Sequence, residues 1–165
     1  MTEVKLVVYP NPVLLKKCEP ITEFNQELKE LAEAMQSLMC KQEGLGLAAP
    51  QVGKSVCLVV CELSYQMEIL VNPVIIDHSD TVVKTVEGCL SLPGLEVRIK
   101  DRWEHIRIKA QDLLGQEFER LLAQKDAVIV QHELDHLQGI TLMEKMDRIQ
   151  RLVKKNAYLK KQKRK

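Results

Sequence analysis

The chain has 165 residues, of which 45% are hydrophobic and 28% are charged. This length suits one domain with its own apolar core, and the composition excludes a disordered or collagen-like chain. No apolar run reaches the roughly 18 residues that a transmembrane helix requires, and the amino terminus lacks a signal-peptide pattern. We therefore expect a cytoplasmic monomer with no membrane partner.

The net charge of +1 conceals an uneven distribution along the chain. Residues 148–165 contain nine of the 24 basic residues and no acidic ones, so residues 1–147 carry 15 basic against 23 acidic side chains. The pattern predicts one domain over residues 1–147 and a basic helical tail over 148–165. Such a tail is either attracted to a polyanion or is simply a solvated terminus.

The first predicted element is an amphipathic helix. Apolar residues recur at helical spacing from Leu28 to Met39, Asn25 is a suitable N-cap, and Gly44 marks the end. The middle of the chain instead shows short β-branched runs, with a hairpin turn at Asp112–Gly115. Their close spacing favours antiparallel pairing of strands at 56–61, 69–76, 81–86, 95–99 and 105–110.

Helical character returns in the last third of the chain. One helix is predicted for Lys125–Leu137, and another from about Asp147 with Ile149, Leu152 and Val153 packing on the domain. Together these elements predict an α+β fold in which antiparallel β-sheets surround a central helix, with an amphipathic helix before them and a C-terminal helix after them.

The five cysteines do not form a disulfide pattern. Their count is odd, and no two have the CxxC spacing of zinc ribbons or redox centres. Cys57 and Cys61 lie in one predicted strand, where four residues span roughly 13 Å, too far for a disulfide. Cys89 has different surroundings, because it follows a glycine at the end of a predicted strand.

A metal-binding pattern lies in the helix predicted for Lys125–Leu137. His132 and His136 are four residues apart and share a face, and Glu133 lies between them in an HExxH sequence. A catalytic site needs a third ligand. Glu144 is the only nearby downstream carboxylate besides Asp147, and the third histidine of the metzincin pattern is absent, which weakens a protease interpretation.

Two upstream segments carry further candidate groups. Gly88 permits a bend that aims the Cys89 thiolate across a pocket, although a small buried thiol is the simpler interpretation. The segment from Gly44 to Gln51 has two glycines that allow close approach of a ligand and ends in an amide donor. The alternative interpretation of this segment is an ordinary glycine-rich connection between two elements.

Taken together, these segments resemble the peptide deformylase family. The family motif G-φ-G-φ-A-A-x-Q, where φ is apolar, corresponds to Gly44–Gln51, E-G-C-L-S to Glu87–Ser91, and Q-H-E-x-D-H-L-x-G to Gln131–Gly139. All three occur without a mismatch and in the family's order. The similarity extends over most of residues 6–147.

The resemblance implies a role for each motif residue. Cys89, His132 and His136 would be the ligands of one divalent metal ion, with water at the fourth position, and Glu133 would be the general base and acid. The ion would be Fe(II) in the cell, and Zn(II) or Ni(II) would also bind. The Gln51 amide and the Leu90 backbone N–H would stabilise the oxyanion.

The resemblance also implies the reaction, removal of the N-formyl group from formyl-methionyl ends of new polypeptides with release of formate. Val128 and Ile129 would line the methionine pocket, and Leu45 and Gly46 would pair with the peptide backbone. The family's substrate-contacting arginine would be Arg102 or, alternatively, Arg98. The basic tail would bring the enzyme to the ribosome.

Three other functions remain open from the residues alone. They are an HExxH zinc endopeptidase, a ribosome- or RNA-binding module with an inactive metal site, and a thiol hydrolase that uses Cys89 with a histidine. Intact Glu133, Gln51 and Cys89 argue against an inactive site. Chelation would abolish a metal-dependent activity and spare a thiol hydrolase.

Overall fold

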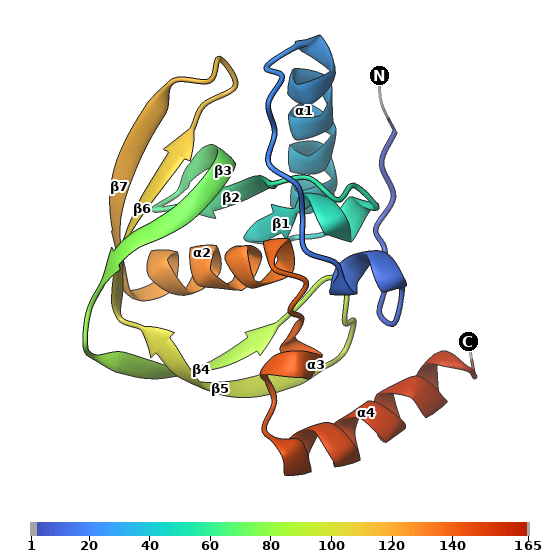
Figure 1. Ribbon diagram of the computed structural model, residues 1–165. Helices are drawn as coiled ribbons and strands as arrows, with labels where there is room; N and C mark the ends of the chain where they lie inside the picture. The colour runs from blue at the N-terminus through green and yellow to red at the C-terminus, as the bar shows by residue number, and fades with distance from the viewer. Residues whose placement is uncertain (1–2, 165) are drawn as a thin grey trace.

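A computed structural model describes residues 3–164 of the chain (Figure 1). Two short 3-10 helices, four α-helices and seven strands are present in this part of the chain. In order they are η1 (Pro12–Leu15), α1 (Gln26–Lys41), β1 (Gly46–Ala48), η2 (Ala49–Val52), β2 (Leu58–Leu63), β3 (Gln66–His78), β4 (Val82–Gly88), β5 (Glu96–Trp103), β6 (His105–Gln111), β7 (Glu117–Ala123), α2 (Gln124–Leu137), α3 (Leu142–Lys145) and α4 (Arg148–Gln162).

The strands form two antiparallel sheets, so the predicted α+β class is confirmed. One sheet has five strands in the order β1-β2-β3-β6-β7, and the other consists of β4 and β5. Helix α2 crosses the molecule between the two sheets, and α1 lies beside the β1 end of the larger one (Figure 1). None of the helices within residues 3–164 is long and apolar enough to span a bilayer.

Helix α1 begins and ends where the sequence predicted. The Asn25 side chain accepts a hydrogen bond of 3.0 Å from the Leu28 N–H, which satisfies one of the free donors of the first turn. The buried face of the helix packs on β1 and β2 through its apolar side chains, which include Ala32, Met35 and Met39.

Helix α2 is held against the larger sheet by a second apolar cluster. Ala127, Val130 and Leu137 are at most 1% exposed and pack with side chains of β2, β3 and β6, among them Val59 and Ile108. The opposite face of α2 therefore looks away from this core, toward β4. That face carries the histidines.

The predicted hairpin turn between β6 and β7 is confirmed. The Asp112 carboxylate accepts hydrogen bonds from the Leu114 and Gln116 N–H groups at 2.8 and 2.9 Å, and Gly115 adopts a φ of 81°. The strand register continues on both sides, from Gln111 opposite Glu117 to His105 opposite Ala123.

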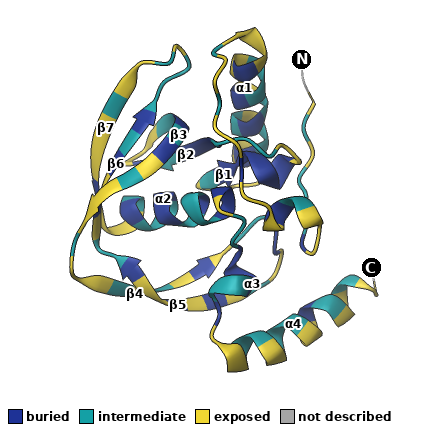
Figure 2. Ribbon diagram, viewed as in Figure 1, coloured by how far each residue is buried: buried dark blue, intermediate teal, exposed yellow. Residues whose placement is uncertain are grey.

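Helix α4 forms as predicted from Asp147, but its expected packing is wrong. Ile149, Leu152 and Val153 are 79%, 71% and 67% exposed, and Figure 2 shows exposed residues along the outer side of this helix. The only residue of α4 that is buried is Tyr158, which makes an edge-to-face contact with Tyr9.

The inner face of α4 is instead largely basic. Arg151 donates to the Glu144 carbonyl oxygen and Lys154 to the Glu96 carbonyl oxygen, both at 2.6 Å, while the Lys155 ammonium lies 5.9 Å from the Tyr9 ring centroid. Long basic side chains can pack their methylene stems on a domain and still satisfy their charged ends, which explains this orientation.

Candidate active site

Three side chains of the metal-binding type meet between α2 and the end of β4. One ligand atom from each of Cys89, His132 and His136 can be chosen so that all lie within 4.8 Å of one another. The two histidines lie one turn apart on α2, and the Cys89 sulfur lies 3.2 Å from His136 Nε2. The structure thus brings together the three residues that the sequence analysis named as metal ligands.

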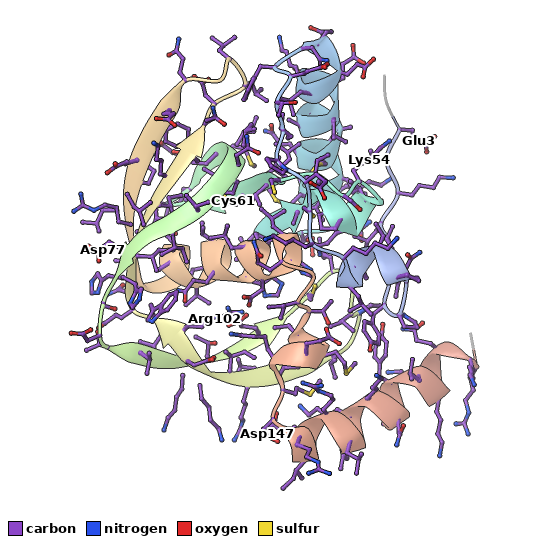
Figure 3. All side chains as sticks on the ribbon, in the orientation of Figure 1. Glu3, Lys54, Cys61, Asp77, Arg102 and Asp147 are labelled. Carbon is purple, nitrogen blue, oxygen red and sulfur yellow. The ribbon has the colours of Figure 1, made fainter. Side chains whose placement is uncertain are left out.

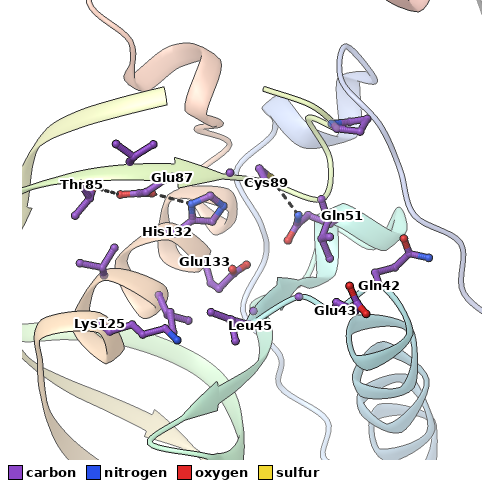
Figure 4. A pocket seen from close by; sticks show the side chains of 18 of the residues that line it. Gln42, Glu43, Leu45, Gln51, Thr85, Glu87, Cys89, Lys125, His132 and Glu133 are labelled. Carbon is purple, nitrogen blue, oxygen red and sulfur yellow. Dashed lines mark hydrogen bonds and ion pairs between the residues drawn. The ribbon is translucent and has the colours of Figure 1, made fainter. Parts of the chain in front are cut away.

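His132 is oriented by a buried carboxylate that the sequence analysis did not single out. His132 Nδ1 lies 2.9 Å from Glu87 Oε2, as Figure 4 shows, so the ring donates to the carboxylate and keeps Nε2 free for a ligand. Glu87 also accepts two hydrogen bonds of 2.8 Å from Arg102 and one of 2.7 Å from Thr85. These donors hold the pKa of Glu87 well below its ordinary range, despite the opposing effect of burial. In the sequence, the only indication of this role for Glu87 was its position two residues before Cys89.

Arg102 lies between α2 and the smaller sheet (Figure 3), where it is 2% exposed. Its third hydrogen bond, of 2.6 Å, goes to Asp135 of α2. The guanidinium therefore joins β4, β5 and α2, and it does not line the pocket described below. The alternative residue, Arg98, is exposed on β5 opposite Val86 and does not line that pocket either.

A bulge in β5 explains why Arg102 points inward. Val83 pairs with Arg102 and Thr85 with Ile99, so β5 has one more residue than β4 between these pairs. The extra residue reverses the alternation of side chains along the strand. Arg102 consequently shares the buried face with Val97 and Ile99, where regular alternation would have exposed it.

Glu133 faces the pocket from α2 and is 4% exposed. Burial raises the pKa of its carboxyl to about 7, while the nearby His132 and Arg102 charges oppose this shift. Gly46 packs so closely that an added Cβ would lie 2.8 Å from Glu133 Cδ. One carboxylate oxygen, Oε2, has no hydrogen-bond partner within the part of the chain described by the structure.

The Gln51 amide is held in a defined orientation. Its Oε1 accepts a hydrogen bond of 2.9 Å from the Ala48 N–H, so its NH₂ group faces Cys89 Sγ at 3.5 Å and Ser91 Oγ at 3.2 Å. Gln51 is 1% exposed, yet it borders the pocket together with Leu90, the residue that follows Cys89. A side-chain donor and the site of a backbone N–H thus flank the cysteine.

These groups open into a pocket of about 970 Å³. Val128 and Ile129, expected to form the methionine pocket, line it, and so do Leu45 and Gly46, expected to pair with the peptide backbone; Figure 4 shows Leu45 across the opening from α2. Residues 83–88 of β4 form another wall. The pocket is apolar over much of its length and polar where it meets His132, Glu133, Gln51 and Cys89.

The donor set fits a divalent transition metal. One thiolate and two imidazoles form a common three-ligand set for such ions and allow a fourth position for water. Burial, together with the charges of His132 and Arg102, keeps the pKa of His136 well below its ordinary range, which favours the neutral form that binds metal. The unpartnered oxygen of Glu133 lies in the same pocket and lacks a partner that a water molecule or a substrate would supply.

Comparison with known proteins agrees with this geometry. A family model described as polypeptide deformylase matches residues 4–152. Peptide deformylase 1B of Arabidopsis thaliana is 40% identical over 150 residues, covering 88% of this chain, which spans only 55% of that protein. Peptide deformylase of Desulfotalea psychrophila is 36% identical over 167 residues, covering 98% of this chain and 95% of the relative.

Solved structures give the same assignment. The crystal structure of the plant peptide deformylase PDF1B is similar with a TM-score of 0.92 and 36% sequence identity, and the match covers 99% of this chain and 91% of that one. The similarity therefore includes both sheets and α2. The chain belongs to the polypeptide deformylase family.

Proposed function

We propose that this protein is a metal-dependent hydrolase that removes the formyl group from N-formyl-methionyl peptides. The observation that carries the proposal is the convergence of Glu133 and the Gln51 amide on the cluster of Cys89, His132 and His136. A proton carrier and an oriented donor thus border a three-ligand metal site. Metal-assisted hydrolysis of a small amide uses this combination.

The three cluster residues would hold one divalent metal ion, which we propose to be Fe(II) in the cell, with Zn(II) and Ni(II) as alternatives. Such an ion supplies Lewis acidity and lowers the pKa of water toward neutrality. The protein's part is to keep the imidazoles neutral and oriented. Glu87 orients the His132 ring, and burial favours the neutral form of His136.

Glu133 would accept a proton from the attacking water and return it to the departing amine. Its buried position raises its affinity for a proton, so it can hold one between the two steps. The Gln51 amide and the Leu90 backbone N–H would donate to the formyl oxygen as negative charge develops on it. The Ala48 N–H fixes the Gln51 amide beforehand, so no reorientation is needed.

The pocket suits a peptide that enters by its formylated end. Val128 and Ile129 lie one turn before His132 on the same face of α2 and provide an apolar surface for the methionine side chain. Leu45 and Gly46 lie at the start of β1, an edge strand whose free side can pair with an extended peptide.

Release of formate from a formyl-Met tripeptide tests the proposal directly. The purified protein is assayed with and without a chelator, and metal ions are then added back singly. We expect activity that is lost with the chelator and restored by a divalent metal. Failure of every metal-loaded form to release formate would refute the proposal.

A thiol hydrolase is the second candidate, because the Cys89 sulfur and His136 Nε2 are only 3.2 Å apart. Activity that survives complete chelation would favour it. The endopeptidase interpretation is not supported by the geometry around Glu144, the downstream carboxylate. Glu144 instead accepts hydrogen bonds from the Thr141 N–H and hydroxyl in a capping box.

We also propose that the basic tail binds the ribosome. Arg151, Lys154 and Lys155 face the domain, so phosphate contacts would come from the exposed basic end of α4. Removal of residues 160–165, of which Lys165 lies outside the described residues, should reduce co-sedimentation with ribosomes at low salt and preserve formyl-peptide turnover. Undiminished, salt-insensitive binding by the truncated protein would contradict this role.

A further inference from the structure

The pocket wall formed by α2 changes along the helix from metal-binding to apolar to positively charged side chains. Ile129, Val128 and Lys125 precede His132 by three, four and seven residues, so the four side chains form one row on the same face. The row begins at the reacting groups and passes two apolar residues. It ends in Lys125, which gives this wall of the pocket a positive charge, and Glu104 lines the pocket as well.

The Lys125 ammonium is available to a ligand. Figure 4 shows the side chain directed from α2 toward the opening that Leu45 borders. Within residues 3–164, no ion pair or hydrogen bond engages this ammonium. Two acidic residues nearby have other partners, since Asp126 accepts hydrogen bonds from Ser64 and Glu104 accepts one from a threonine hydroxyl.

The start of α2 adds to the positive potential at this end of the pocket. The helix begins at Gln124, which also lines the pocket, and the N-cap Ala123 provides no side-chain hydrogen bond. The first turn of a helix carries a partial positive charge from its free N–H groups. Lys125 and the helix terminus therefore both favour an electron-rich group here.

The dimensions allow a substrate side chain to reach this charge. From His132 to Lys125, seven residues of helix rise about 10.5 Å. An extended methionine side chain spans roughly 5 Å and a lysine side chain roughly 6 Å by ordinary bond lengths. A first residue whose formyl group lies at His132 and Glu133 thus places its side-chain tip near Val128 and Ile129, within reach of the ammonium.

We propose that Lys125 extends the substrate range to first residues whose side chains end in a hydrogen-bond acceptor, with N-formyl-methionine sulfoxide as the representative. This inference rests on the proposed deformylase function and deepens it. The methylene stem of Lys125 packs against an unmodified methionine, and its ammonium donates to the sulfoxide oxygen of an oxidised one. Val128 and Ile129 still select for side-chain length.

The test uses three formyl tripeptides that differ only in the first residue, which is methionine, methionine sulfoxide or norleucine. Norleucine has the length of methionine without an acceptor. We expect the ratio of kcat/KM for the sulfoxide to that for norleucine to fall at least about tenfold in Lys125→Leu, because one charge-assisted hydrogen bond is lost. Lys125→Arg should keep most of the ratio.

Lys84→Leu is the matched control. Lys84 also borders the pocket, but its neighbours Val83 and Thr85 are the partly buried residues of β4, so the alternation of the strand directs Lys84 outward. An unchanged ratio in Lys125→Leu, or an equal fall in Lys84→Leu, would overturn the inference. Absence of formate release from the formyl-Met peptide by the wild-type protein would instead refute the proposed function.

Discussion

Replacing Arg102 with leucine removes three charge-assisted hydrogen bonds of 2.6 to 2.8 Å. The Asp135 side chain is 21% exposed and can regain water, whereas that of Glu87 is 6% exposed and is left as a buried charge without its main partner. Breaking a buried ion pair in this way costs about 3–5 kcal/mol. We expect the free energy of unfolding of Arg102→Leu to fall by that amount in urea denaturation of metal-free protein at neutral pH.

Two further variants isolate the cause. Arg120→Leu, which removes an exposed arginine 3.5 Å from Glu68, should cost less than about 1 kcal/mol. Adding Glu87→Gln to Arg102→Leu should recover part of the loss, because a neutral amide needs no counter-charge. Since the pKa of Glu87 is lowered from 4.5, the wild-type contribution persists above that pH and disappears in stronger acid. A loss in Arg102→Leu no larger than in Arg120→Leu would refute the reasoning.

Three other predictions concern the site itself. Glu133→Gln should keep its metal content and lose about 10²- to 10⁴-fold in kcat, and near-normal turnover would remove Glu133 from the proton transfer. Cys89→Ser should bind metal at least about tenfold more weakly in competition with a chelator, whereas the buried Cys61→Ser should match the wild-type protein. Gly46→Ala should lower kcat about 10- to 100-fold, because the added Cβ displaces the Glu133 carboxylate. In Gly88→Ala the added Cβ has its nearest neighbour at 3.9 Å, so this variant should keep its metal. Equal kcat in Gly46→Ala and the wild-type protein would contradict the steric argument.

The histidine pair could be predicted because its spacing is local, whereas the roles of Cys89, Gln51 and Leu90 came from the family resemblance. Four residues on a helix always place His132 and His136 on one face, and the Asn25 cap and the turn at Asp112 also depend only on neighbouring residues. Strand β1 was missed for the opposite reason. It has three residues in a glycine-rich segment and exists through its pairing with β2.

The arginine assignment required information that no local pattern contains. Side-chain alternation along β5 places Arg102 outside, and only the pairing with β4 reveals the extra residue that turns it inward. Helix α4 presents a similar difficulty. Its apolar stripe and its basic face are both plausible packing surfaces by sequence, and hydrogen bonds to the Glu144 and Glu96 carbonyl oxygens select the basic one.

The attachment of α4 has a consequence for the dynamics of the protein. With its apolar stripe in solvent, the helix adds only the buried Tyr158 and the partly buried Leu159 to the shared core. Its detachment would expose little surface, so it can open as a separate low-energy unit while α2 and both sheets stay folded. Backbone amides of α4 would then exchange with deuterium through this local opening, and those of α2 only when the whole domain unfolds.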